Sequence, residues 1–192
     1  MRNVIVSSTR RVFDGFFKID EARVAHQQFD GTMGPPRDLL VFERGDAAAI
    51  LLHDVVADQL VMTEQFRYPT YDKGPGWLLE IAAGMIDGED EPEDTARREA
   101  EEELGYRIEG EPISLGTFYL APGGSSERIH IFYAEVSEEN RVGEGGGLAA
   151  EGEDIRVARV DIGMGKVEKM LRGEVHDAKT VIALQWFQHH IL

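Results

Sequence analysis

Residues 84–106 read GMIDGEDEPEDTARREAEEELGY, and no other stretch predicts as much of the fold and chemistry of this chain. A loop that begins at Gly84 leads into a short helix that ends at Gly105. Glu99, Glu102 and Glu103 are three and four residues apart, so their carboxylates share one helix face. Such like charges repel unless a cation lies among them, and clustered carboxylate oxygens suit Mg²⁺ or Mn²⁺. The spacing therefore predicts a divalent-metal site.

The alternative is an acidic helix that only faces water, since runs of glutamate are commonly solvated. The helix ends argue against it. Asp90 and Glu93 have the spacing of a capping box, Pro92 suits the first turn, and Gly105 suits the last. Two glycines in the preceding loop indicate a required backbone shape. These features favour a built site over a solvated surface.

The composition limits the class of protein. A length of 192 residues with 42% apolar residues suits one domain with a real core. Without cysteine, the chain has no disulfide, zinc–thiolate site or thiol nucleophile. The net charge of −16 argues against binding to nucleic acid or acidic membranes. Because there is no long apolar run and no secretion signal, we expect a cytoplasmic protein that neither spans nor binds a membrane.

The apolar pattern along the chain predicts an α+β fold. Residues 1–44 show two or three strands joined by hairpins. A Gly- and Glu-rich stretch at 140–152 is typical of a mobile loop. We expect further strands at 47–52, 60–66, 77–81, 113–120, 129–136 and 155–160, a Pro/Gly-rich loop at 68–76, and helices at 166–172 and 180–191.

The stretch from Gly84 resembles the Nudix box, a long motif with fixed spacing. The matching positions are Gly84, Arg98, Glu99, Glu102, Glu103 and Gly105. Three positions depart: Asp90 replaces a glutamate, while Ala100 and Tyr106 replace bulky aliphatic residues. In the family that glutamate supports the loop, whereas the helix acids bind metal. Asp90 therefore bears on the rigidity of the loop more than on metal binding.

Nearly the whole chain resembles the nucleoside-diphosphate-sugar branch of these hydrolases, the ADP-ribose and GDP-mannose pyrophosphatases. Pro122, 16 residues beyond Tyr106, matches a proline that marks the ADP-ribose group and that GDP-mannose members share. The resemblance implies an α/β/α sandwich with a mixed sheet. It also implies an N-terminal strand region at 1–44 that pairs across a homodimer, followed by a catalytic domain at 45–192. The other matching segments are Phe16-Phe17, Phe42–Gly45, Glu64–Arg67, Trp77–Glu80 and Ala121–Glu127.

The resemblance also assigns roles to acids and to one carbonyl. The implied metal ligands are Glu99, Glu103, Glu153 and the carbonyl of Ala83. Glu151 is implied as the general base, with Glu102 contributing to catalysis. From the residues alone, Glu151 and Glu153 would be solvated loop acids, and an alignment shift of two residues would exchange their roles.

Several further residues are candidates for substrate contacts. A guanidinium can grip two phosphate oxygens, which favours Arg67, while Arg37 and Arg44 could equally form surface ion pairs. Glu80 could accept hydrogen bonds from sugar hydroxyls or pair with Arg67. The remaining candidates are Phe16, for base stacking in the partner subunit's site or as a core aromatic, and Met85, for the pocket lining.

The expected function is therefore Mg²⁺- or Mn²⁺-dependent hydrolysis of a nucleoside-diphosphate sugar. ADP-ribose, giving AMP and ribose 5-phosphate, is the leading substrate, and GDP-mannose is the alternative. A non-catalytic nucleotide-sugar sensor on the same scaffold is a further alternative, because fold does not fix function. The intact helix carboxylates argue against a sensor. The N-terminal strands and Pro122 argue against a Nudix enzyme for another substrate class.

Overall fold

The computed structural model describes residues 2–163 and 165–192, apart from the side chain of Glu151. Contacts between Cα atoms divide the chain into two compact units. One holds the chain up to Gly45 together with residues 119–128, and the other holds residues 46–118 and 129–192. The second unit combines a sheet of parallel and antiparallel strands with helices, so the predicted α+β class is confirmed.

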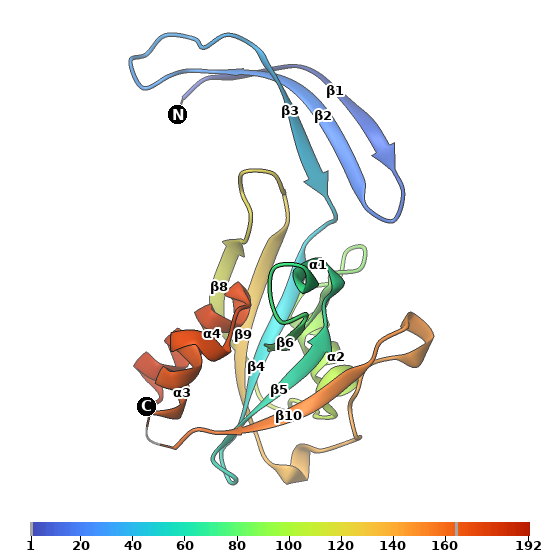
Figure 1. Ribbon diagram of the computed structural model, residues 1–192, viewed down its shortest axis with the longest axis vertical. Helices are drawn as coiled ribbons and strands as arrows, with labels where there is room; N and C mark the ends of the chain where they lie inside the picture. The colour runs from blue at the N-terminus through green and yellow to red at the C-terminus, as the bar shows by residue number, and fades with distance from the viewer. Residues whose placement is uncertain (1, 164) are drawn as a thin grey trace. The chain divides into compact units, whose positions relative to one another are not determined.

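The N-terminal unit is a three-stranded antiparallel sheet in the order β1-β2-β3 (Figure 1). Its strands are β1 (Val4–Asp14), β2 (Lys18–His26) and β3 (Arg37–Glu43). The segment that contains Pro122 returns to this unit, where the amide of Phe42 donates to the carbonyl of Gly124 at 2.7 Å. Every residue of β1 is exposed, although the strand carries several large apolar side chains. The sheet therefore has an apolar surface that this chain does not cover within its own unit.

The second unit is built on a seven-stranded mixed sheet with the path β10-β5-β4-β9-β8, with β6 paired to β5 and β7 paired to β4. The central strand β4 pairs antiparallel with β5 and parallel with β9. All eight residues of β4 are buried, as expected for a strand covered on both faces. The strands are β4 (Ala47–Asp54), β5 (Gln59–Phe66), β6 (Trp77–Glu80), β7 (Ala82–Met85), β8 (Ile113–Tyr119), β9 (Arg128–Val136) and β10 (Ile155–Asp161).

Two hydrophobic cores lie on opposite faces of this sheet, because alternate residues of β4 point to opposite sides. Helix α2 (Pro92–Leu104) packs through Ala96, Ala100 and Leu104 on one face. Helix α4 (Ala178–His190) packs through Leu184 and Phe187 on the other, beside α3 (Lys166–Lys169) (Figure 1). The predicted sandwich of a sheet between helices is confirmed for this unit.

The remaining elements are short. Residues 68–76, predicted as a loop, contain the one-turn helix α1 (Tyr68–Tyr71), in which Pro69 occupies the first turn. The segment after α3 continues as η3 (Met170–Glu174), and two single turns, η1 (Glu138–Asn140) and η2 (Ala149–Glu151), flank the Gly-rich stretch. Within the described residues, no helix is long and apolar enough to cross a membrane.

Candidate active site

Helix α2 begins differently from the prediction. Its N-cap is Glu91, with an extended backbone and no side-chain cap hydrogen bond, and Pro92 is the first helical residue. The predicted capping box between Asp90 and Glu93 is therefore wrong. The helix starts one residue too late for it, and Glu93 instead pairs with Arg97 at 2.6 Å. The fixed φ of proline and the helix dipole, which favours acids in the first turn, define this end without a capping box.

The other end of α2 follows the prediction. Gly105 adopts the left-handed conformation, with φ of 80°, and its amide donates to the carbonyl of Glu101 at 3.1 Å. A Cβ atom at this position would lie 2.4 Å from the carbonyl oxygen of Gly143. Glycine is thus required both for the backbone conformation and for the approach of the Gly-rich loop.

Gly84 is required for space. A Cβ atom there would lie 1.9 Å from Oε1 of Glu99, so the carboxylate of Glu99 rests against the glycine backbone. Gly84 is not among the residues with positive φ, whereas Gly88 is, at 58°. In this loop, Gly84 therefore makes room for the Glu99 carboxylate, and Gly88 allows the backbone to turn.

The acidic face of α2 is arranged around Arg98. Its Nη1 atom lies 2.8 Å from Oε1 of Glu99 and 3.2 Å from Oε2 of Glu102. Its Nη2 atom donates to the carbonyl of Met85 at 3.3 Å. Burial lowers the pKa of Arg98, but the neighbouring carboxylates outweigh burial and the net pKa is raised. Arg98 thus ties the helix acids to strand β7.

Glu103 is an acid of this face with a strongly raised pKa. It is buried, and its Oε2 atom accepts from the amide of Ala83 at 3.1 Å. Burial and the charges of Glu99 and Glu153 raise its pKa to about 8, against the opposing effects of the Ala83 amide and Arg67. Without a cation, Glu103 therefore carries a proton at neutral pH.

The Gly-rich stretch lies along the C-terminal end of α2. The amides of Gly146 and Gly147 donate to the carbonyls of Glu103 and Glu102 at 2.9 and 3.0 Å. A Cβ atom on Gly145, whose φ is 68°, would lie 2.5 Å from the carbonyl oxygen of Glu103. Specific backbone contacts thus hold the first half of a segment that its composition predicts to be mobile.

The second half of this stretch carries the loop acids. Oε2 of Glu153 accepts from the amide of Leu148 at 2.8 Å, and the charge of Glu153 acts on Glu103. Glu151 ends the turn η2, and its side chain lies outside the part of the chain that the structure describes. The structure therefore brings Glu153 to the helix acids and leaves the prediction for Glu151 untested.

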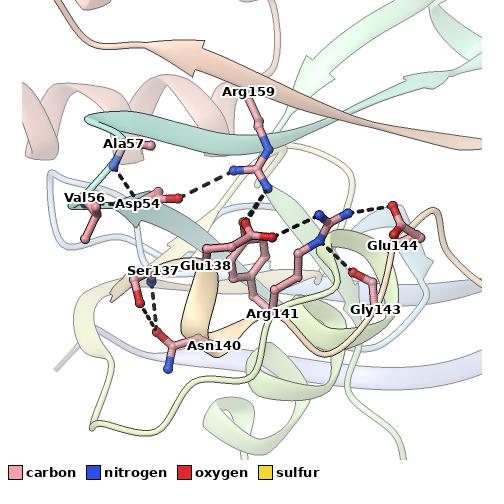
Figure 2. Close-up of polar contacts among 11 residues, drawn as sticks. Asp54, Val56, Ala57, Ser137, Glu138, Asn140, Arg141, Gly143, Glu144 and Arg159 are labelled. Carbon is pink, nitrogen blue, oxygen red and sulfur yellow. Dashed lines mark hydrogen bonds and ion pairs between the residues drawn. The ribbon is translucent and has the colours of Figure 1, made fainter.

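A polar cluster anchors the base of the loop (Figure 2). Arg141 donates through Nε to the carbonyl of Gly143 at 3.1 Å and pairs with Glu138 and Glu144 at 3.2 and 2.6 Å. Arg159, from β10, lies between Asp54 and Glu138 and contacts the hydroxyl of Tyr106. The cluster joins β4, β10 and Tyr106, just beyond the end of α2, to the start of the loop.

Arg67 and Glu80 form the pair that was one of the two alternatives for Glu80. The Nε atom of Arg67 lies 2.8 Å from Oε2 of Glu80, which is buried. Sequence reasoning missed the second partner of this carboxylate, Lys179 of α4, whose Nζ atom contacts Oε1. A lysine in the first turn of a helix opposes the helix dipole, and this unfavourable position was the sequence feature that could have indicated an acidic partner.

The remaining candidates for substrate contacts are Phe16, Arg37, Arg44 and Met85. Phe16, at the β1–β2 hairpin, is 94% exposed, so the core alternative for it is wrong. Arg37 begins β3, and Arg44 lies 3.7 Å from Glu127, as its ion-pair alternative predicted. These three belong to the N-terminal unit. The side chain of Met85 packs against the core cluster beneath α4.

Comparison with known proteins gives a family. A sequence model of the NUDIX domain matches residues 43–184. The chain belongs to the NUDIX family. The ADP-ribose pyrophosphatase of Escherichia coli strain K12 is 40% identical over 189 residues, which cover 98% of this chain and 89% of that protein. The GDP-mannose pyrophosphatase of Shigella flexneri serotype 5b is 41% identical over 150 residues, 77% of this chain and 76% of that protein.

A solved structure supports the fold. The crystal structure of an ADP compounds hydrolase superposes with a TM-score of 0.69 at 17% identity, covering 98% of this chain and 96% of that one. At this identity the likeness concerns the fold alone, and it extends over both units of the NUDIX chain.

NUDIX proteins typically depend on a divalent metal, and the residues present here fit one. Carboxylates and a nearby backbone carbonyl are ligands that hard cations prefer. A buried acid whose pKa is raised by like charges gains most from a cation. Within the described residues, no three His, Asp or Glu side chains already stand in a metal-holding arrangement. Glu99 and Glu102 face Arg98, and Glu103 accepts from the Ala83 amide.

Proposed function

We propose that this NUDIX chain is a Mg²⁺-dependent pyrophosphatase that hydrolyses ADP-ribose to AMP and ribose 5-phosphate. The proposal rests on how much of the chain is similar to a known ADP-ribose pyrophosphatase. The E. coli ADP-ribose pyrophosphatase is similar across 98% of this chain, N-terminal sheet included. The GDP-mannose pyrophosphatase is equally identical over 77%, which makes GDP-mannose the second candidate substrate.

The proposed metal ligands are Glu99, Glu103, Glu153 and the carbonyl of Ala83. When bound, Mg²⁺ or Mn²⁺ neutralises the diphosphate and lowers the pKa of coordinated water. The raised pKa of Glu103 supports this assignment, because a bound cation would offset the burial and the like charges that raise it. Glu102 pairs with Arg98 and thereby helps to fix the positions of the other acids on this helix face. Its contribution to catalysis is therefore to position those acids.

Two charged groups are proposed to act on the substrate directly. Glu151 accepts the proton of the attacking water, from a loop whose base is fixed on α2. Arg67 holds the diphosphate, and its position near the acids is supported by its effect on Glu103. Glu80 then serves Arg67 as an ion-pair partner, and a role in binding sugar hydroxyls is not proposed for it.

The N-terminal unit is proposed to form a homodimer and to supply Phe16, Arg37 and Arg44 to substrate binding. Support comes from the exposed apolar residues of β1 and from the ring of Phe16, which is 94% exposed and meets the ring of Phe17 edge-on. An exposed aromatic ring can stack on a nucleotide base at low conformational cost. The sensor alternative is disfavoured because the acids of α2 are all retained.

A substrate panel tests the proposal. Purified protein would be assayed on ADP-ribose, GDP-mannose, ADP-glucose and NADH, with Mg²⁺ and with EDTA. We expect the highest kcat/KM for ADP-ribose and no turnover in EDTA. A preference for GDP-mannose would move the assignment to the second candidate, and the absence of turnover on every compound would favour the sensor.

Glu103→Gln tests the metal site. Because Glu103 carries a proton in metal-free protein at neutral pH, glutamine mimics that state and the fold should persist. Turnover should fall by about two orders of magnitude or more, since a ligand charge is lost. Mg²⁺ should raise the Tm of the wild type and leave that of the variant unchanged.

Glu101→Gln is the matched control, since this acid of α2 pairs with Arg107 instead. Near-normal turnover of Glu103→Gln at saturating Mg²⁺ would contradict the site. The same assay separates the loop acids: Glu151→Gln should lower kcat, and Glu153→Gln should raise the Mg²⁺ requirement.

A further inference from the structure

The carboxylate of Glu80 is buried between two cations. Glu80 is 3% exposed and Lys179 is 7% exposed, and the two side chains meet through Oε1 and Nζ. The other oxygen, Oε2, accepts from Nε of Arg67 at 2.8 Å. A buried carboxylate is tolerated when both oxygens are paired in this way. Each cation therefore takes one oxygen.

This division leaves part of Arg67 uncommitted. An arginine alone with a carboxylate commonly binds through two nitrogens, one to each oxygen. Here Arg67 uses Nε only, and within the described residues its two terminal nitrogens make no hydrogen bond or ion pair. The guanidinium is partly exposed, so these nitrogens can reach a ligand. Arg67 is thus held through Nε by Glu80, while its two terminal nitrogens are available to a ligand.

Lys179 is itself fixed by the start of α4. Its Nζ atom lies 3.1 Å from Oδ2 of Asp177, the N-cap residue, which also accepts from the amide of Thr180 at 2.9 Å. The hydroxyl of Thr180 accepts from the amide of Ile81 at 2.9 Å. Helix and strand are thus locked together directly beside Glu80, and Lys179 has little freedom to leave it.

We propose that Lys179 is a positioning residue for substrate binding. By occupying Oε1 of Glu80, it restricts Arg67 to a contact through Nε alone and leaves the two terminal nitrogens of Arg67 for a diphosphate. The inference rests on the proposed function for the identity of the ligand. Without Lys179, the free oxygen of Glu80 would draw Arg67 into a two-nitrogen pair and away from the substrate.

Lys179→Met removes the charge and keeps the length of the side chain. We expect KM for ADP-ribose to rise about tenfold while kcat changes less than about threefold, because a ground-state contact to the diphosphate is weakened. The affinity for ADP with Mg²⁺, measured by calorimetry, should fall by a similar factor. A purely structural role would instead lower the folded fraction and leave the KM of the folded enzyme unchanged.

The double variant Lys179→Met with Glu80→Gln sharpens the test. Glutamine can still accept from Nε of Arg67 but carries no charge to draw it back, so KM should return to within about threefold of the wild type. The double variant also removes the unpaired buried charge, which preserves folding if the single variant is unstable. A KM that stays high in the double variant, or one that never rises in the folded single variant, would overturn the proposal.

Lys169→Met is the matched control, because Lys169 lies on α3 and, among the residues that the structure describes, pairs with Glu174 alone at the surface. The outcomes for the two proposals are separable. If the wild type and this control do not hydrolyse ADP-ribose, the proposed function fails. The ADP-binding ratio between wild type and Lys179→Met still decides the role of Lys179.

Discussion

His53 is a buried histidine of β4 whose surroundings disfavour its charge. It is 7% exposed, its Nδ1 atom lies 3.0 Å from the hydroxyl of Tyr133, and its Nε2 atom has no partner within the described residues. Burial lowers the pKa of His53 below its ordinary value of 6.5, against the opposing charges of Glu135, Asp58 and Asp54.

This lowered pKa predicts acid sensitivity. As the pH falls below 6.5, the unfolded chain takes up a proton on His53 that the folded chain does not, so the free energy of unfolding decreases. The loss is at most about 1.4 kcal/mol per pH unit. Urea unfolding at pH 7.5 and 5.5 should show a larger drop for the wild type than for His53→Gln. The exposed His176→Gln serves as control, and equal drops in wild type and His53→Gln would contradict the prediction.

Residue spacing predicts contacts that are local and misses those that the fold creates. Glu99 and Glu103 could be placed on one face because helix geometry fixes the relation of residues four apart. Lys179 could not be placed beside Glu80, since 99 residues separate them and only the packing of α4 on the sheet joins them. The fold and the helix acids were predictable, while the second partner of the buried carboxylate was not.

Residues 143–147 of the Gly-rich stretch form a brace, by which we mean the backbone contacts that link α2 to the loop acids. Its amides satisfy carbonyls that the end of a helix leaves without partners. Gly145 can lie there because it has no Cβ atom. Composition alone predicted a mobile connector, because it cannot show that the glycines are close-packed. The same limit explains the wrong capping box: proline and helix packing, and not the acid spacing, determine where α2 starts.

Gly145→Ala should displace this brace. The new Cβ atom would meet the carbonyl oxygen of Glu103, and alanine would be strained at φ of 68° by about 1 kcal/mol or more. We expect kcat to fall at least about tenfold with a modest loss in Tm. Gly110→Ala is the control, because a Cβ atom there meets nothing within 4 Å. Unchanged kcat in Gly145→Ala would show that the loop acids do not depend on the brace.

At the scale of the whole molecule, the N-terminal sheet is the part with the least cover. Its residues Val4, Ile5, Val6 and Phe13 are exposed on β1, and a small sheet whose apolar side chains stay in water has little independent stability. A two-fold pairing of such sheets would bury these side chains and close the assembly at two subunits. The charge of −16 keeps the remaining surface from associating further.

Light scattering tests the homodimer. Full-length protein should have twice the mass of one chain, and a truncation that begins near Arg44 should lose the dimer together with substrate affinity. Two results would refute this expectation: a monomeric full-length protein with full activity, or a truncated form that is soluble and binds ADP normally.

The parallel pairing of β4 with β9 has a consequence for biosynthesis. Ala47 pairs with Ile129, so the chain must grow by 82 residues before the central strand meets this neighbour. At elongation rates of about 5–20 residues per second, this wait lasts roughly 4–16 seconds. During that time a strand whose first six residues are all apolar has one open edge near the ribosome. Chaperone demand during translation, rather than the stability of the finished protein, should therefore limit the yield of this enzyme when synthesis is fast.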